Sequence, residues 1–163
     1  IRIEITETDT ALTIVIEDNG CGMTEEVVRQ VSNPFYTTRT TRKVGLGVPL
    51  LTLAAEQTGG SVTIRSDTAE ESPDAHGTTV TALFHKDHLD FTPLGDMVST
   101  MTTLIQGSPS IDFVFSHTLP DRTVSLDTAE LRQVFGEDVS LGNFEVLQWI
   151  DAYLREQYDA SVS

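Results

Sequence analysis

Two glycine-rich turns, each next to a regular element, constrain the fold of this chain more than any other feature of its sequence. The first, Asp18–Met23, follows the alternating apolar segment Leu12–Ile16, which predicts a β-strand. Thr24 then caps a predicted helix whose valines recur at helical spacing. The second, Gly45–Gly47, opens a strongly apolar segment of helical length. This alternation of strand, glycine turn and helix predicts a layered α/β fold.

Two further strands complete the first part of the predicted fold. Ser61–Ser66 and Thr78–Phe84 have the composition of strands, and the polar, acidic stretch Asp67–His76 joins them as an exposed connection. Arg2–Thr6 alternates charged and branched apolar residues and predicts the first strand. Together these elements predict a two-layer α/β sandwich, in which helices cover one face of a mixed, mostly antiparallel sheet.

The residues beyond the last of these strands predict a second, smaller unit. Lys86–Pro93 is a charged joint, and beyond it the patterns predict a helix over Leu94–Ile105, two short strands and two terminal helices. The last helix, Asn143–Tyr158, carries an apolar stripe that we interpret as core packing, with a partner-binding surface as the alternative. We therefore expect one domain over residues 1–88 and a small α+β appendage over residues 89–163.

Composition disfavours several classes of function. The chain has 25 acidic and 10 basic residues, a net charge of −15, and such a field repels a phosphate backbone, so we expect no nucleic-acid partner. No apolar run approaches the roughly 18 residues of a membrane span. The single cysteine, Cys21, cannot form an internal disulfide, which favours a cytoplasmic location.

The first glycine turn has the chemistry of a purine site. Asp18 at a strand end, followed by Gly20 and Gly22, lets a carboxylate point into a pocket while the backbone approaches a ligand closely. A buried carboxylate accepts a hydrogen bond from the exocyclic amino group of adenine, whereas guanine presents a carbonyl at that position. Taken alone, these residues are equally typical of a plain turn.

The second glycine turn and the loop before it favour a bound polyphosphate. Free backbone N–H groups and the helix dipole at Gly45–Gly47 can receive phosphates. Arg39, Arg42 and Lys43 concentrate three of the ten basic residues in the preceding loop, although a merely solvated loop is the alternative. The glycine spacing is that of neither a P-loop nor a dinucleotide-binding turn, so a different nucleotide fold is required.

Four segments together resemble the nucleotide boxes of the gyrase, heat-shock chaperone, histidine kinase and mismatch-repair (GHKL) superfamily. They are, in order, Asp18–Met23, Asn33–Thr38, Gly45–Leu50 and Gly77–Thr79. The second and third look most like those of histidine kinases, and the resemblance covers Ile1 to about His85. It implies a Bergerat-type sandwich that binds ATP with Mg²⁺.

The resemblance also implies a role for each matching residue. Asp18 would hold the adenine amino group and share a water with Thr78, while Gly22 and Met23 would border the base. The loop Phe35–Val44 would be an ATP lid. The implied nucleotide-binding residues are Asp18, Gly20, Gly22, Met23, Phe35, Thr37, Thr38, Arg42, Lys43, Gly45, Leu46, Gly47 and Thr78. No side chain of this chain is assigned to the metal ion.

Two features of the superfamily have no counterpart in this sequence. The family places a helix before the first strand, with an asparagine that helps hold Mg²⁺ and, in some subfamilies, an acid–base residue. No such helix precedes Arg2, so we expect that the chain is cut from a longer protein and leave the catalytic residues unassigned. The four histidines do not fit a phosphoacceptor, and we expect structural or solvated roles for them. They are His76, His85, His88 and His117.

The leading interpretation is an ATP-binding domain of histidine-kinase type, within a signalling kinase or an ATP-dependent regulator. The complete protein would then be an ATPase or a protein-histidine kinase. One alternative is a non-kinase switch, in which ATP changes the contact of residues 89–163 with a protein partner. A mismatch-repair-type ATPase and a degenerate module without ATP are further alternatives, and a homodimer is a candidate assembly.

Overall fold

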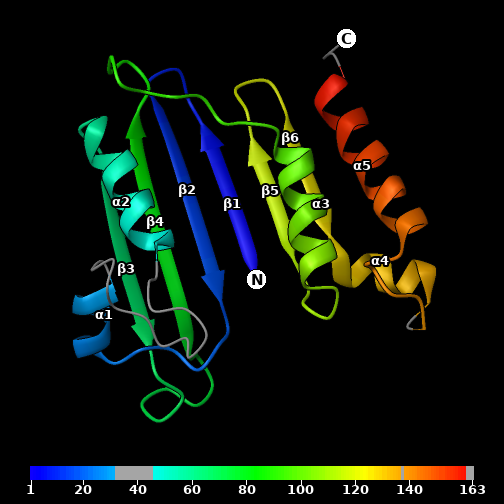
Figure 1. Cartoon of the computed structure of the whole chain (residues 1–163), viewed down its shortest axis with the longest axis horizontal. Helices are drawn as coiled ribbons and strands as arrows, with labels where there is room; N and C mark the ends of the chain where they lie inside the picture. The colour runs from blue at the N-terminus through cyan, green and yellow to red at the C-terminus, as the bar shows by residue number, and fades with distance from the viewer. Residues whose placement is uncertain (32–45, 137, 161–163) are drawn as a thin grey trace. The chain divides into compact units, whose positions relative to one another are not determined.

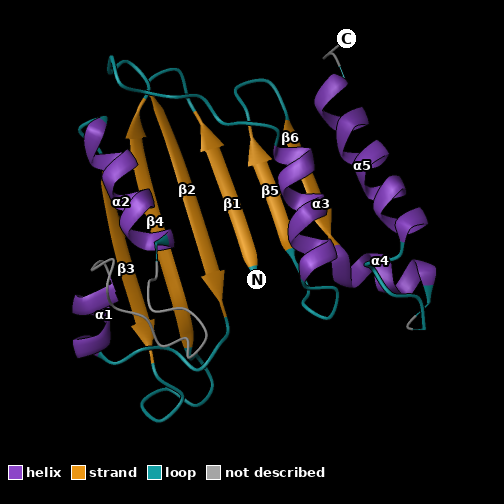
Figure 2. Ribbon diagram, viewed as in Figure 1, coloured by secondary structure: helices purple, strands orange, loops and turns teal. Residues whose placement is uncertain are grey.

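The computed structural model describes residues 1–31, 46–136 and 138–160. These ranges contain six β-strands and five α-helices, which confirms the predicted mixed α and β class (Figures 1 and 2). The chain divides into two compact units. The central unit comprises Glu7–Thr92, and the terminal unit joins Ile1–Thr6 to Pro93–Ser163.

The central unit is built on three antiparallel strands in the order β3-β4-β2. They are β2 (Ala11–Asp18), β3 (Ser61–Asp67) and β4 (Gly77–His85). The register sets Asp18 opposite Thr78 and Asp67 opposite Gly77. The polar ends of all three strands therefore lie together at one end of this sheet.

Two helices belong to the central unit. The short helix α1 (Glu25–Val31) contacts β3. The helix α2 (Gly47–Gln57) packs over β3 and β4, as Figure 1 shows. Leu12, Ala55 and Ala82 are buried, because α2 and the middle of the sheet exclude water between them. The predicted order of strand, turn and helix is confirmed here.

The terminal unit contains the first strand of the chain. Its strands are β1 (Arg2–Glu7, of which Glu7 falls in the central unit), β5 (Val114–Thr118) and β6 (Thr123–Asp127). β1 pairs with β5 in parallel, and β5 pairs with β6 antiparallel. Alternate side chains of these strands are buried, namely Ile3, Ile5, Phe115, Val124 and Leu126. The period of two expected of strands with one covered face is therefore present.

Three helices complete the terminal unit. They are α3 (Met97–Gly107), α4 (Thr128–Phe135) and α5 (Phe144–Asp159). The predicted stripe of α5 is only partly core, because Val146, Ile150 and Leu154 are buried while Tyr153 is 37% and Trp149 42% exposed. None of the helices in the described ranges combines the length and the apolar character that a bilayer crossing requires.

Candidate functional site

The carboxylate of Asp18 is oriented by the turn that follows it. Its Oδ1 atom accepts a hydrogen bond of 2.8 Å from the backbone N–H of Gly20. A side chain at Gly20 would collide with this oxygen, since its Cβ would lie 2.7 Å away. Within the described part of the chain, no protein group donates to Oδ2. One oxygen therefore fixes the turn and the other remains able to accept from a ligand.

Two glycines allow the turn to pack directly against neighbouring backbone. Gly22 has a φ of 71°, and a Cβ there would lie 1.8 Å from the carbonyl oxygen of Asp67. Gly77 has a φ of 141°, and its Cβ would lie 2.0 Å from the carbonyl oxygen of Asp18. Only glycine satisfies both the positive φ and this approach.

The end of β3 and the connection from β3 to β4 together hold three backbone groups of the turn. His76 Nδ1 donates to the carbonyl oxygen of Gly20 at 2.5 Å, and the N–H of Ala69 donates to that of Cys21 at 3.2 Å. The Ser66 hydroxyl accepts from the N–H of Met23 at 2.8 Å. The stretch expected to be a mere exposed connection thus contributes to the geometry of the turn.

Ser66 also reaches the start of β4. Its Oγ lies 2.9 Å from the Gly77 carbonyl oxygen and 2.8 Å from Thr78 Oγ1. Ser66 is not among the site residues predicted from the sequence. Its signal is that it shares a strand face with Val62 and Ile64, where a hydroxyl requires a hydrogen-bonding partner.

The structure brings together five of the predicted nucleotide-binding residues. These are Asp18, Gly20, Gly22, Met23 and Thr78. No hydrogen bond among the described residues joins this group to Leu46 and Gly47 at the start of α2. Six predicted residues lie outside the described ranges, namely Phe35, Thr37, Thr38, Arg42, Lys43 and Gly45.

The start of α2 presents backbone donors. Leu46 occupies the N-cap position without a side-chain hydrogen bond, and the first intrahelical bond runs from the N–H of Leu50 to its carbonyl. The N–H groups of Gly47 and Val48 precede that bond and have no intrahelical acceptor. Among the described residues, nothing lies within 4 Å of a Cβ built on Gly47.

Metal-binding side chains are not grouped in the described ranges. These residues contain no cluster of three or more His, Cys, Asp or Glu side chains that could hold an ion. His76 donates to Gly20 as described above, and buried His117 contacts the Tyr158 hydroxyl at 2.8 Å. Both contacts lie within the fold and join segments that are far apart in the sequence.

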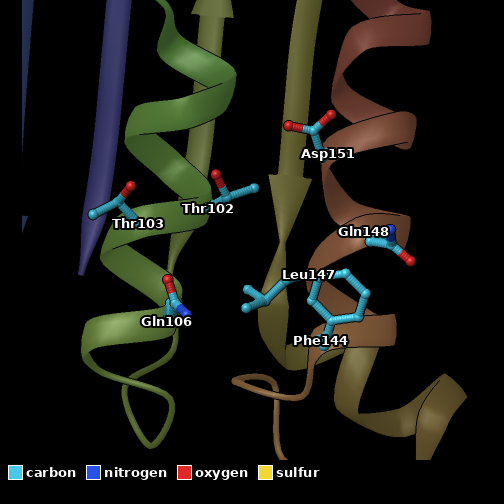
Figure 3. A pocket seen from close by; sticks show the side chains of 7 residues that line it. All are labelled: Thr102, Thr103, Gln106, Phe144, Leu147, Gln148 and Asp151. Carbon is cyan, nitrogen blue, oxygen red and sulfur yellow. The ribbon is translucent and has the colours of Figure 1, made fainter.

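The terminal unit contains a shallow groove between α3 and α5 (Figure 3). Its volume is about 420 Å³. The lining residues are Thr102, Thr103, Gln106, Phe144, Leu147, Gln148 and Asp151. Phe144 is 71% exposed, which is unusual for an aromatic side chain at a helix start.

Comparison with known proteins points to the same half of the chain. Residues 1–88 match the family described as histidine kinase-, DNA gyrase B-, and HSP90-like ATPase. The tetrathionate sensor histidine kinase TtrS of Salmonella typhimurium is 37% identical over 77 residues, which are 47% of this chain. The matched segment spans only 12% of that relative's length.

Proposed function

Because the chain belongs to the family of histidine kinase-, DNA gyrase B-, and HSP90-like ATPases, we propose that residues 1–88 are an ATP-binding domain of histidine-kinase type. The observation that carries the proposal is the carboxylate of Asp18. The Gly20 N–H orients one of its oxygens, and the other has no protein donor within the described ranges. The register places Thr78 opposite it at the start of β4.

This arrangement fits adenine better than guanine. A carboxylate oxygen accepts hydrogen bonds and cannot donate one when it is ionised. The exocyclic amino group of adenine supplies a donor, whereas the carbonyl of guanine would leave the carboxylate facing another acceptor. Gly22 and Met23 border the base in this proposal, and Gly20 maintains the turn.

The phosphates would extend toward the start of α2. The N–H groups of Gly47 and Val48 have no intrahelical acceptor and could donate to an anion. The positive end of the helix dipole lies at the same place and also favours negative charge. The predicted lid, with Thr37, Thr38, Arg42 and Lys43, would neutralise further phosphate charge. Mg²⁺, when bound with ATP, would neutralise charge on the phosphates, and residues of this chain would contribute by fixing the base.

The complete protein would act in signalling as a kinase or an ATP-dependent regulator in the cytoplasm. The name of one matching relative, a sensor histidine kinase, supports this. The phosphate acceptor would be supplied by another part of the protein or by a partner, and the hydrogen bonds of His76 and His117 within the fold are consistent with this.

Calorimetric titration with ATP and Mg²⁺ tests the proposed domain. Asp18→Asn should weaken ATP binding at least about tenfold, because a hydrogen bond to a charged acceptor is lost. Asp9→Asn is the matched control, since it removes the same charge from an exposed turn. GTP should not displace ATP from the wild-type chain. Equal binding by wild type and Asp18→Asn would contradict the proposal.

A second candidate function is an ATP-driven contact between residues 89–163 and a protein partner. The groove between α3 and α5 and the exposed ring of Phe144 favour it. Hydrogen exchange of these two helices, measured with and without ATP, tests the idea. An ATP-driven switch should change the exchange rates of these helices, whereas the rates with and without ATP should be equal if residues 89–163 do not respond to ATP.

Measurement of the molecular mass in solution tests the candidate homodimer.

A further inference from the structure

Ser66 is placed where two parts of the candidate adenine site meet. Its hydroxyl oxygen lies within hydrogen-bond distance of the N–H of Met23, the carbonyl of Gly77 and the hydroxyl of Thr78. Met23 is predicted to border the base and Thr78 to share a water with Asp18, and Ser66 itself is half-buried. One side chain of β3 therefore connects the glycine turn to the start of β4.

Counting donors fixes the direction of these three hydrogen bonds. The Met23 N–H can only donate, so the Ser66 oxygen accepts there. The Gly77 carbonyl can only accept, so it takes the single proton of Ser66. No proton of Ser66 is left for Thr78, and Thr78 must donate its own to the Ser66 oxygen. The remaining capacity of the Thr78 hydroxyl is that of an acceptor.

We propose that Ser66 is a specificity-determining residue of the nucleotide site, because it makes Thr78 an acceptor toward the ligand. The proposal rests on the proposed ATP-binding function. Asp18 Oδ2 is an acceptor as well, so this edge of the site offers acceptors only. It therefore favours a purine with a donor at position 6, directly or through water, and disfavours a 6-oxo purine.

The role differs from simple support of the turn. If Ser66 only supported Met23, its loss would lower the binding affinity for every purine nucleotide by the same factor. If it sets the direction of the Thr78 hydrogen bond, its loss frees the Thr78 proton to meet a carbonyl. The preference for ATP over inosine triphosphate would then narrow, because the freed Thr78 proton can be donated to the carbonyl at position 6 of the inosine base.

The experiment is titration of the full chain with ATP and with inosine triphosphate, each with Mg²⁺. Ser66→Ala should reduce the preference for ATP about fivefold, which corresponds to one hydrogen bond. Ser66→Thr keeps the hydroxyl and should retain the wild-type preference. Ser61→Ala, an exposed serine of the same strand, is the matched control. In a Thr78→Val background, Ser66→Ala should change the preference no further.

The outcomes separate this inference from the proposed function. A wild-type chain that binds neither nucleotide overturns both. A wild-type chain that binds both nucleotides equally overturns the role of Ser66 in specificity and leaves ATP binding standing. A wild-type preference that survives Ser66→Ala, with both affinities lowered equally, overturns the role of Ser66 and leaves the ATP site standing. Thermal unfolding of each variant precedes the titrations. If Ser66→Ala does not fold, Ser66→Cys, whose thiol donates and accepts only weakly, should narrow the preference in the same direction by a smaller factor.

Discussion

At the scale of single residues, the packing of Gly22 leads to a stability prediction. Its φ is 71°, and a Cβ would lie 1.8 Å from the Asp67 carbonyl oxygen. Gly22→Ala therefore forces both an unfavourable backbone conformation and a collision with backbone that cannot rotate away. We expect it to lower the free energy of unfolding by about 1–3 kcal/mol or more, measured by urea denaturation.

Gly47→Ala is the matched control for this change. It adds the same methyl group, but no described residue lies within 4 Å of the new Cβ, and alanine is favoured in a helix. We expect the free energy of unfolding to stay constant or to rise slightly. Equal loss in both variants would show that the close approach at Gly22 has no energetic consequence.

At the scale of elements, side-chain caps define where helices of the terminal unit begin. Asp127 Oδ1 accepts from the N–H of Ala129 at 2.8 Å and of Glu130 at 3.3 Å at the start of α4. Asp127→Ala removes this cap, and we expect a loss of about 1 kcal/mol in thermal or urea unfolding. Asp127→Asn should lose less, because an amide oxygen still caps. An Asp127→Ala variant that is as stable as the wild type would contradict the prediction.

The cap of α3 adds a dependence on pH. The pKa of Asp96 lies below its usual 3.8, because the N–H and the hydroxyl of Ser99 donate hydrogen bonds to the carboxylate. The positive charge of Arg155 lowers the pKa further. A lowered pKa means that the ionised form is favoured in the fold. Its stabilising effect is present above pH 3.8 and is lost as pH falls through the lowered pKa. Asp96→Asn keeps a cap without titrating, so its unfolding midpoint should fall less below pH 3.8.

The helices and strands show how much of the fold could be predicted from the sequence alone. Alternation and capping residues are local signals, so the four strands before residue 89, α2, α3 and α5 were predicted close to their observed bounds, whereas α4 was predicted without bounds. The parallel pairing of β1 with β5 joins segments more than a hundred residues apart, and no local pattern encodes it. In the site, Asp18 and its glycines have a recognisable spacing. Ser66 and His76 act through contacts across strands, which only the fold reveals.

At the scale of the whole molecule, charge predicts a dependence of stability on salt. The net charge is −15, with 25 acidic and 10 basic residues, so the negative charges outnumber the groups that could pair with them. Raising ionic strength from 0.1 to 1 M shortens the Debye length from about 10 to 3 Å and screens this repulsion. Salt also weakens exposed ion pairs, such as Arg29 with Glu25, but each contributes only about 0–1 kcal/mol. Repulsion should therefore dominate the response.

We accordingly expect the unfolding midpoint of this chain to rise with KCl, as measured by thermal denaturation at neutral pH. A variant in which four exposed acidic residues are replaced by their amides tests the cause. The residues are Glu26, Glu70, Asp74 and Asp87. With four negative charges fewer, the variant should start from a higher midpoint at low salt and respond less to KCl, because less repulsion remains to be screened. An equal response in both chains would assign the effect of salt to hydrophobic burial, which KCl alters in both alike.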